Sequence, residues 1–281
     1  MNKDKFTGIL LISDYDGTFT SSVPENYKKN VAAVKKFKAG GGLFAFATGR
    51  DYHSLLAIEP DFESIANAPV IMANGSRLYD TGKKEYIFSY TLNLPLFAEF
   101  LETVYKIYPD IGVRFSCDDG MVIPVLNKII KDDLNDLFMR HIPFREMSVK
   151  ELIDSGDRVY KCVMIHSPEK IDRVRKLALK FHGTSEICFT KTYSRGFEAV
   201  NINASKGATA ARLREYLSER DKREYKLYAI GDYDNDLELI KLAEFSGAPE
   251  NALEEVKKAA KVITVACKDG AVADFINNYL F

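Results

Sequence analysis

The first third of the chain alternates between continuous apolar runs and stretches that carry apolar residues at helical spacing. The apolar runs predict strands buried on both faces, over residues 9–12, 43–47 and 69–73. The helical spacing predicts helices over residues 24–38 and about 51–58. This alternation of strand and helix is typical of a parallel sheet with helices packed on its faces.

The pattern changes in the middle of the chain, where turn residues join short strands directly. Residues 77–90 predict a hairpin around Thr81-Gly82, and residues 111–126 predict another around Asp118-Asp119-Gly120. The other elements expected here are helices over residues 95–108, 128–140 and 169–181 and strands over residues 159–166 and 187–190. We therefore expect an α+β domain inserted at residues 83–190.

The parallel rhythm returns after the insertion. The elements expected here are an extended segment over 197–202, a helix from Ser205 to about 219, a strand over 226–230, strands near Phe245 and over 262–265, and a last helix over 270–280. The predicted fold is α/β. A Rossmann-like, doubly wound parallel sheet is formed by residues 1–82 and 191–281, and it carries the inserted domain.

Composition narrows the classes of partner. The 281 residues carry a formal net charge of −1, so no bulk field attracts nucleic acid or an anionic membrane. The first apolar run ends at Ser13, too early for a signal peptide, and no apolar segment approaches the roughly 18 residues of a membrane span. The four cysteines lie far apart and predict reduced thiols. We expect a cytoplasmic protein that binds neither nucleic acid nor membrane. Its oligomeric state is left open, and a monomer is compatible with the sequence.

Candidate chemistry begins at the end of the first strand, where Asp14 and Asp16 follow the apolar run. Ligands of doubly wound sheets bind beyond the carboxyl ends of the strands. Two carboxylates there repel one another unless a cation neutralises them, and oxygen ligands favour Mg²⁺. The alternative is a plain surface turn, since Asp and Gly are common turn residues.

Three further polar residues are expected near the same edge of the sheet. Thr48 ends the second strand and Asp232 ends a late one. Lys206 falls in the first turn of a helix, where the macrodipole disfavours a cation by roughly 0.3–1 kcal/mol. A phosphate bound nearby would compensate for that placement.

Taken in order, four motifs resemble those of the haloacid dehalogenase superfamily. They are Asp14-Tyr15-Asp16-Gly17-Thr18, Thr48-Gly49-Arg50, Ser205-Lys206-Gly207 and Gly231-Asp232-Tyr233-Asp234-Asn235-Asp236. The insertion resembles the type IIB cap of the Cof-type phosphatases, and Asn74-Gly75 fits the same group. Two positions depart from the family pattern: Tyr15 replaces a usual aliphatic residue, and Ala248-Pro249-Glu250 replaces a usual Met-Gly before Asn251-Ala252.

The resemblance implies a division of roles among the acidic residues. Asp14 would attack phosphorus and form an aspartyl-phosphate, and Asp16 would act as general acid and then general base. Asp14, Asp232 and the backbone carbonyl of Asp16 would bind Mg²⁺. Asp236 would orient Lys206 or a water bound to the metal.

The same resemblance implies the contacts to the substrate. Thr48, Lys206, Asn235 and the amides of Tyr15 and Gly49 would surround the transferred phosphoryl group. Apart from the resemblance, the places of Arg50, Asn74, Lys191 and Arg195 along the chain make them possible contacts to the rest of the substrate.

The predicted activity is a Mg²⁺-dependent phosphatase that acts on small phosphorylated metabolites, sugar phosphates first. A phosphomutase of the phosphomannomutase type is an alternative, and it would need a bisphosphate activator and release little free phosphate. A phospho-accepting signalling domain is a third hypothesis, and a long-lived acyl phosphate would support it.

Overall fold

The computed structural model describes residues 4–135, 139 and 141–280. Its contacts divide the chain into two compact units. The first, which we call the core unit, comprises Met1–Gly49, Asp61–Phe88 and Ser205–Phe281. The second, the inserted unit, comprises Arg50–Pro60 and Ser89–Ala204.

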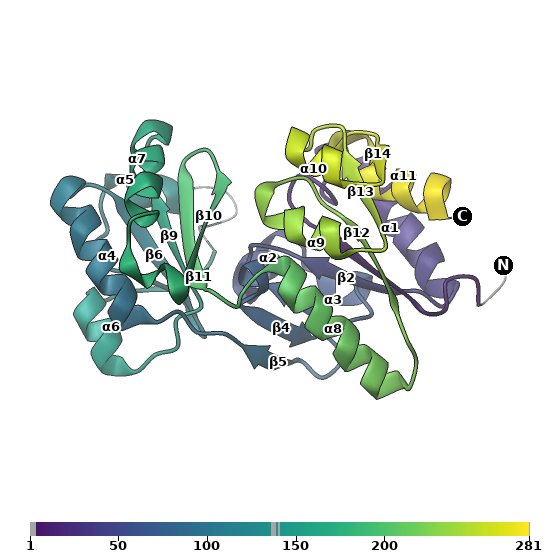
Figure 1. The fold of residues 1–281 in the computed structure, drawn as a ribbon, viewed down its shortest axis with the longest axis horizontal. Helices are drawn as coiled ribbons and strands as arrows, with labels where there is room; N and C mark the ends of the chain where they lie inside the picture. Colours follow the sequence, from purple (N-terminus) through teal and green to yellow (C-terminus); the bar gives the residue numbers. More distant parts are fainter. Residues whose placement is uncertain (1–3, 136–138, 140, 281) are drawn as a thin grey trace. The chain divides into compact units, whose positions relative to one another are not determined.

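The core unit is built on an eight-stranded sheet of order β14-β13-β12-β1-β2-β3-β4-β5 (Figure 1). Strand β1 (Ile9–Asp14) lies between β2 (Leu43–Ala47) and β12 (Lys226–Ile230), and both pairings are parallel. The sequence therefore runs outward from β1 in both directions, which places a topological switch point at its carboxyl end. The remaining strands are β3 (Val70–Met72), β4 (Arg77–Asp80), β5 (Glu85–Ser89), β13 (Phe245–Pro249) and β14 (Val262–Thr264).

Helices cover the core sheet because successive strand residues point to opposite faces. Leu10 and Ile12 share one hydrophobic cluster with Ala210, Leu239 and Val256, which belong to three of the helices. On the neighbouring strand β2 the phenylalanine rings of Phe44 and Phe46 pack edge to face at 5.1 Å. The helices of this unit are α1 (Pro24–Ala39), α3 (Phe62–Ile65), α8 (Lys206–Asp221), α9 (Leu237–Leu242), α10 (Glu254–Ala259) and α11 (Ala271–Asp274), which is followed by a π-helix over Phe275–Leu280.

The inserted unit is built on a six-stranded sheet of order β10-β11-β9-β6-β7-β8. Its described pairings are antiparallel except that of β7 with β8. The strands are β6 (Gly112–Cys117), β7 (Gly120–Ile123), β8 (Phe144–Glu146), β9 (Lys161–Ile165), β10 (Ile187–Tyr193) and β11 (Gly196–Asn201). The helices are α2 (Tyr52–Ile58), α4 (Leu94–Ile107), α5 (Lys128–Leu134), α6 (Val149–Ser155) and α7 (Pro168–Ala178).

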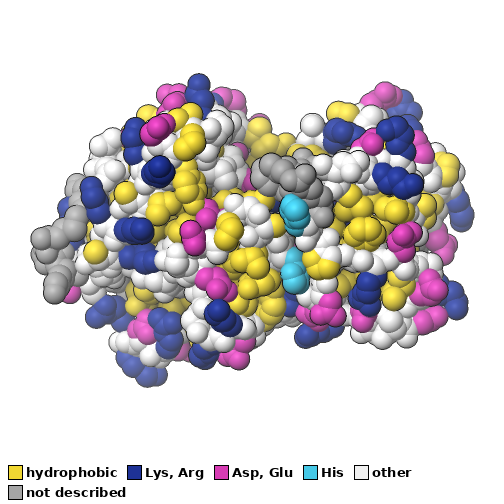
Figure 2. All heavy atoms as spheres, turned by 180° about the vertical axis from the view of Figure 1, so that it is seen from behind, with side chains coloured by type: hydrophobic (Ala, Val, Ile, Leu, Met, Phe, Trp, Pro, Cys, Tyr) yellow, Lys and Arg dark blue, Asp and Glu magenta, His cyan; other side chains and the backbone are white. Residues whose placement is uncertain are grey.

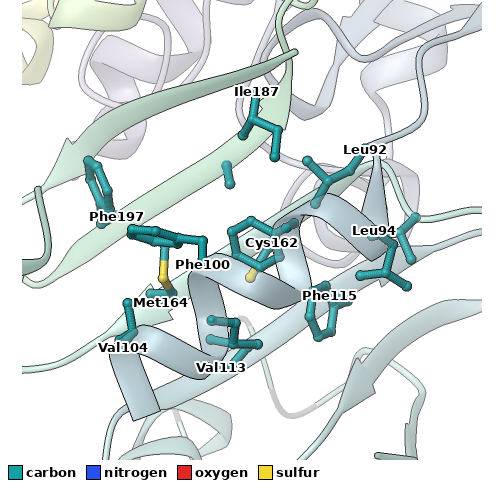
Figure 3. Packing of buried hydrophobic residues seen from close by; sticks show 14 of the residues in the cluster. Leu92, Leu94, Phe100, Val104, Val113, Phe115, Cys162, Met164, Ile187 and Phe197 are labelled. Carbon is teal, nitrogen blue, oxygen red and sulfur yellow. The ribbon is translucent and has the colours of Figure 1, made fainter. Parts of the chain in front are cut away.

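The inserted unit has its own hydrophobic core between α4 and this sheet. Phe100 and Val104 of α4 share it with Phe115, Met164 and Phe197 of the strands, and all of them are at most 2% exposed. Figure 3 shows these side chains gathered between the helix and the strands. The buried side of the helix predicted over residues 95–108 is therefore part of the core of the inserted unit.

The predicted fold class is confirmed, since the chain combines an inserted α+β unit with a core sheet that is parallel from β14 to β3, β4 pairing antiparallel with β3. The boundaries differ from the expected residues 83 and 190. Strand β5 extends the core sheet, whereas β11 pairs antiparallel with β9 and β10 of the inserted sheet. A short extended segment such as that of β11 is compatible with either kind of sheet, so its pattern alone does not select the sheet.

Four other elements differ from expectation. The helix predicted over residues 128–140 ends at Leu134, and residues 136–138 and 140 of that prediction lie outside the described part. Strand β8 and helix α6 were not predicted. Helix α2 follows the second motif as expected, but it groups with the inserted unit.

Charge is mixed over the face drawn in Figure 2, where basic and acidic side chains lie interspersed. This agrees with a sequence of 39 basic and 40 acidic residues. No helix in the described part of the chain combines the length and the apolar character needed to cross a bilayer.

Candidate active site

Three buried carboxylates meet at the carboxyl edge of the core sheet. Asp14 is the last residue of β1, and Asp232 and Asp236 follow the neighbouring parallel strand β12. Each of the three offers a carboxylate oxygen that lies within 4.8 Å of those of the other two. The structure thus brings Asp14 and Asp232, 218 positions apart in the sequence, into one cluster.

Lys206 is the cation of this cluster. Its Nζ donates hydrogen bonds to Asp14 Oδ1 at 2.5 Å and to Asp236 Oδ1 at 2.7 Å, and the side chain is 1% exposed. Lys206 is the first residue of α8, and the Ser205 side chain caps that helix by accepting from the Ala208 amide. The two carboxylates compensate for the unfavourable position of a cation at a helix N-terminus.

Asp236 is held more firmly than the other two carboxylates. Its Oδ2 accepts hydrogen bonds from the backbone amides of Asp232 and Tyr233, both at 3.0 Å, while Oδ1 accepts from Lys206. A Cβ on Gly231 would lie 2.6 Å from Asp236 Cγ, so a larger residue there would displace this carboxylate. These contacts suit a residue that orients Lys206 and the loop after β12.

Negative charge exceeds positive charge in the cluster, and the pKa values reflect it. Burial raises the pKa of Asp14 well above its ordinary value; Lys206 lowers it, and Asp236 and Asp232 raise it further. Burial and the Asp236 carboxylate raise the pKa of Asp232 to about 6. Burial lowers the pKa of Lys206, but Asp14 and Asp236 together raise it above the ordinary lysine value.

A divalent cation fits this donor set. The cluster offers only oxygen ligands, and one ammonium group cannot neutralise three carboxylates. Asp236 already accepts three hydrogen bonds, which leaves Asp14 and Asp232 as the carboxylates available to an ion.

The loop after β1 brings Asp16 and Thr18 to the cluster. Asp16 is exposed, and its side chain is not one of the three clustered carboxylates. Gly17 has φ of +82°, and a Cβ there would lie 2.5 Å from Asp232 Oδ2, so the loop can approach Asp232 only with glycine. Thr18 Oγ1 donates a hydrogen bond to Asp232 Oδ1 at 2.7 Å. Sequence reasoning gave Thr18 no role, although it lies within the first motif.

Thr48, Gly49, Asn74 and Asn235 form a second group in the core unit. The backbone amide of Asn74 donates to the carbonyl of Thr48 at 3.0 Å. Asn235 Nδ2 donates to Asn74 Oδ1 at 3.0 Å, and a Cβ on Gly49 would lie 3.0 Å from that same oxygen. The structure therefore joins Asn74, predicted as a substrate contact, directly to residues predicted to bind phosphate.

A sequence model of the haloacid dehalogenase-like hydrolases matches residues 11–276 of the chain. The chain belongs to this family. The four motifs that carried the resemblance fall within the matched span, and the resemblance is confirmed.

Curated relatives of this hydrolase extend over almost its whole length. The 5-amino-6-(5-phospho-D-ribitylamino)uracil phosphatase YwtE of Bacillus subtilis (strain 168) is 24% identical over 286 residues, covering 95% of this chain and 96% of the relative. The phosphatase YbjI of Escherichia coli (strain K12), which has the same name, is 28% identical over 273 residues and covers 96% of both chains. By family and relatives the chain is a phosphatase.

Solved structures show the same fold. The HAD subclass IIB sugar phosphatase BT4131 superposes with a TM-score of 0.78 at 18% identity, over 97% of this chain and 100% of that one. At this identity the likeness concerns the fold, including the inserted unit.

The two departures from the family pattern have structural explanations. The Tyr15 ring is 2% exposed and packs between Phe19, at 6.1 Å, and Phe46, at 5.5 Å, so an aromatic residue here belongs to the aromatic core. After Ala248-Pro249-Glu250, Asn251 Nδ2 donates to the Gly17 carbonyl at 2.9 Å. The altered loop thus still contacts the loop that carries Asp16. The sequence analysis did not predict this contact.

Arg50, Lys191 and Arg195 belong to the inserted unit. Arg50 Nη1 donates to Ser54 Oγ at 3.1 Å, and Lys191 Nζ pairs with Asp172 at 2.7 Å. Arg195 is exposed in the turn between β10 and β11. Their role as substrate contacts stays a prediction.

Proposed function

We propose that the chain is a Mg²⁺-dependent phosphatase that hydrolyses small phosphorylated metabolites through an aspartyl-phosphate on Asp14. One observation carries this proposal: Asp14 and Asp232 lie together at the carboxyl edge of the core sheet, and Lys206 alone does not offset the charge of the three clustered carboxylates. Among oxygen-ligated cations, Mg²⁺ is the usual partner of carboxylates in phosphoryl-transfer sites.

Asp14 is suited to act as the nucleophile. Its Oδ1 accepts a hydrogen bond from Lys206 at 2.5 Å, which orients the carboxylate for attack on phosphorus. The P–O bond to the leaving alcohol breaks as the bond to the Asp14 oxygen forms. Water then attacks phosphorus, the bond between phosphorus and the Asp14 oxygen breaks, and inorganic phosphate leaves as the Asp14 carboxylate is restored, so that one difficult displacement becomes two easier ones.

Asp16 is suited to move protons in both steps. It lies on the turn two residues beyond Asp14, and its side chain is exposed rather than buried in the anionic cluster. As a general acid it would protonate the leaving alcohol, and as a general base it would then deprotonate the attacking water.

Mg²⁺ would be held by Asp14, Asp232 and the backbone carbonyl of Asp16. When bound, it supplies positive charge that shields the anionic ester from Asp14 and stabilises charge on the phosphoryl oxygens. Lys206, Thr48 and Asn235 would surround the same oxygens.

The proposed substrates are sugar or polyol phosphates. Two curated relatives are named as phosphatases of 5-amino-6-(5-phospho-D-ribitylamino)uracil, a phosphorylated ribityl compound, and the solved relative BT4131 is named a sugar phosphatase. A hydroxyl-rich leaving group is common to these names.

A phosphate-release screen tests the proposal. The panel comprises sugar phosphates, ribityl phosphates and nucleotide phosphates, each assayed with Mg²⁺ and with EDTA. We expect turnover of at least one sugar or polyol phosphate with Mg²⁺ only, and loss of that turnover in Asp14→Asn. Turnover in EDTA would contradict the metal dependence, and retained turnover in Asp14→Asn would contradict the nucleophile.

A further inference from the structure

The turn after β3 has a backbone that residues with side chains rarely adopt. Ala73 and Asn74 have φ values of +49° and +55°, and Gly75 follows with φ of +95°. For residues other than glycine this left-handed region is unfavourable, and asparagine tolerates it better than alanine does. Such backbone strain persists only where the surrounding structure imposes it, and it is frequent at functional sites.

Two motif segments hold this turn in place. The Asn74 amide donates to the Thr48 carbonyl at 3.0 Å, which ties the turn to the end of β2. Thr209 Oγ1 of α8 donates to the Gly75 carbonyl at 2.8 Å. A Cβ on Gly75 would overlap the backbone of Ser205, so the turn packs closely against the start of α8.

The side chain of Asn74 then fills the space between two further motif residues. It is 5% exposed, and its Oδ1 accepts a hydrogen bond from Asn235 Nδ2 at 3.0 Å. Gly49 lies beside the same oxygen, where a Cβ would approach it to 3.0 Å. The carboxamide of Asn74 thus contacts both the segment after β2 and the loop after β12.

We propose that Asn74 is a positioning residue, whose carboxamide fixes the spacing between Asn235 and the Thr48–Gly49 segment around the transferred phosphoryl group. This inference rests on the proposed function and assigns Asn74 a role through Asn235, in place of the predicted contact to the substrate. Groups that are held in place before the reaction stabilise developing charge without reorganising. The strained turn is the structural means of holding them.

Asn74→Gly separates this role from a structural one. Glycine adopts the left-handed conformation readily, so the variant keeps the turn and removes the side chain that carries the carboxamide. We expect its melting temperature to equal or exceed that of the wild type. We expect kcat to fall about tenfold to a hundredfold, with KM changed less than about threefold. Complete removal of a preorganised hydrogen-bond donor lowers kcat by about 10²–10³-fold, and Asn74→Gly displaces the donor Asn235 without removing it, so the loss should be smaller. A kcat within about twofold of the wild type would overturn the inference.

A double-mutant cycle tests whether Asn74 acts through Asn235. If it does, adding Asn74→Gly to Asn235→Ala changes kcat/KM by less than about threefold, although each substitution alone has a large effect. Effects that multiply would overturn the inference.

Asn67→Gly is the matched control. Asn67 Oδ1 accepts from the Phe44 amide at 2.7 Å and its Nδ2 donates to the Gly42 carbonyl at 3.1 Å, at the opposite end of β2. The control loses two hydrogen bonds and should keep kcat/KM within about twofold. An equal loss of kcat in Asn67→Gly would show a general effect of asparagine removal and overturn the specific role.

The proposed function can fail separately. If the wild type hydrolyses no ester in the screen, the same cycle is measured by titration calorimetry with inorganic phosphate in the presence of Mg²⁺. Non-additive losses of phosphate affinity would then support the positioning role without the enzymatic one. Additive losses, or no phosphate binding to the wild type, would overturn it.

Discussion

Replacing Asp232 by asparagine should stabilise the metal-free protein while it abolishes activity. Burial and the Asp236 carboxylate raise the pKa of Asp232 to about 6. Relative to an ordinary aspartate pKa of about 3.9, that difference corresponds to about 3 kcal/mol for holding the anion at neutral pH. Asparagine has no charge, and its oxygen can still accept the hydrogen bond that Thr18 donates at 2.7 Å.

The gain in the free energy of unfolding should be smaller than the cost of holding the Asp232 anion, because the amide group of the variant also needs hydrogen-bond partners in the cluster. We expect an increase of about 1–2 kcal/mol in the free energy of unfolding, or about 3–6 °C in Tm. The assay is thermal denaturation of both proteins in EDTA and in Mg²⁺. The wild type should gain about 2.7 kcal/mol at a Mg²⁺ concentration a hundredfold above Kd, and the variant should gain far less.

The pH dependence gives the same test a defined sign. Native Asp232 keeps its proton up to about pH 6, whereas the unfolded chain releases it near the ordinary pKa. Between these two pH values the native state binds more protons than the unfolded state. The contribution of Asp232 to stability therefore falls as pH rises through this window. In EDTA, the advantage of Asp232→Asn should appear as pH rises from about 4 to 7. A variant less stable than the wild type at neutral pH, or a Mg²⁺ effect equal in both proteins, would refute this reasoning.

Three other substitutions have expected outcomes. Ala73→Gly should raise the free energy of unfolding by about 1 kcal/mol in urea denaturation, since glycine relieves the backbone strain of Ala73; a decrease would contradict that strain. Lys206→Met should remove activity and destabilise the metal-free protein by about 3–5 kcal/mol in the same assay, because it leaves Asp14 and Asp236 buried without their cation; unchanged stability would show that Lys206 does not balance them. Asn251→Ala should weaken the apparent affinity for Mg²⁺ about tenfold in a titration of phosphate release, since it frees the Gly17 carbonyl; an unchanged Mg²⁺ dependence would argue against that support.

Local pattern was sufficient for the core sheet and for the residues that end its strands. The apolar run before Asp14 predicts a buried strand, and the order of strands and helices predicts a parallel sheet. Carboxyl ends of parallel strands meet at one edge, which is why Asp14 and Asp232 could be expected to lie together.

The contacts that depend on how distant strands align could not be predicted from the sequence. Thr18 and Asp232 lie 214 positions apart, and their hydrogen bond depends on how β1 and β12 align and on the turn at Gly17. The same holds for Asn74, whose contact with Asn235 spans 161 positions. Side-chain periodicity determines which face of an element is buried but not which distant loop lies against it.

The boundary of the inserted unit also could not be predicted from the sequence. Strand β11 is buried from Gly196 to Val200, as a strand of the parallel sheet would be, yet it pairs antiparallel with β9 and β10. Hydrophobic pattern reports burial, and both sheets bury such a strand, so only the pairing partner distinguishes them.

The central claim is that Asp14 becomes phosphorylated during turnover. The direct measurement is rapid acid quench of the enzyme during steady-state hydrolysis, followed by borohydride reduction, which converts an aspartyl-phosphate to homoserine, and by peptide mass spectrometry. The account predicts homoserine at position 14 only when substrate and Mg²⁺ are both present. Active turnover with homoserine at another position, and Asp14 unmodified, would contradict it.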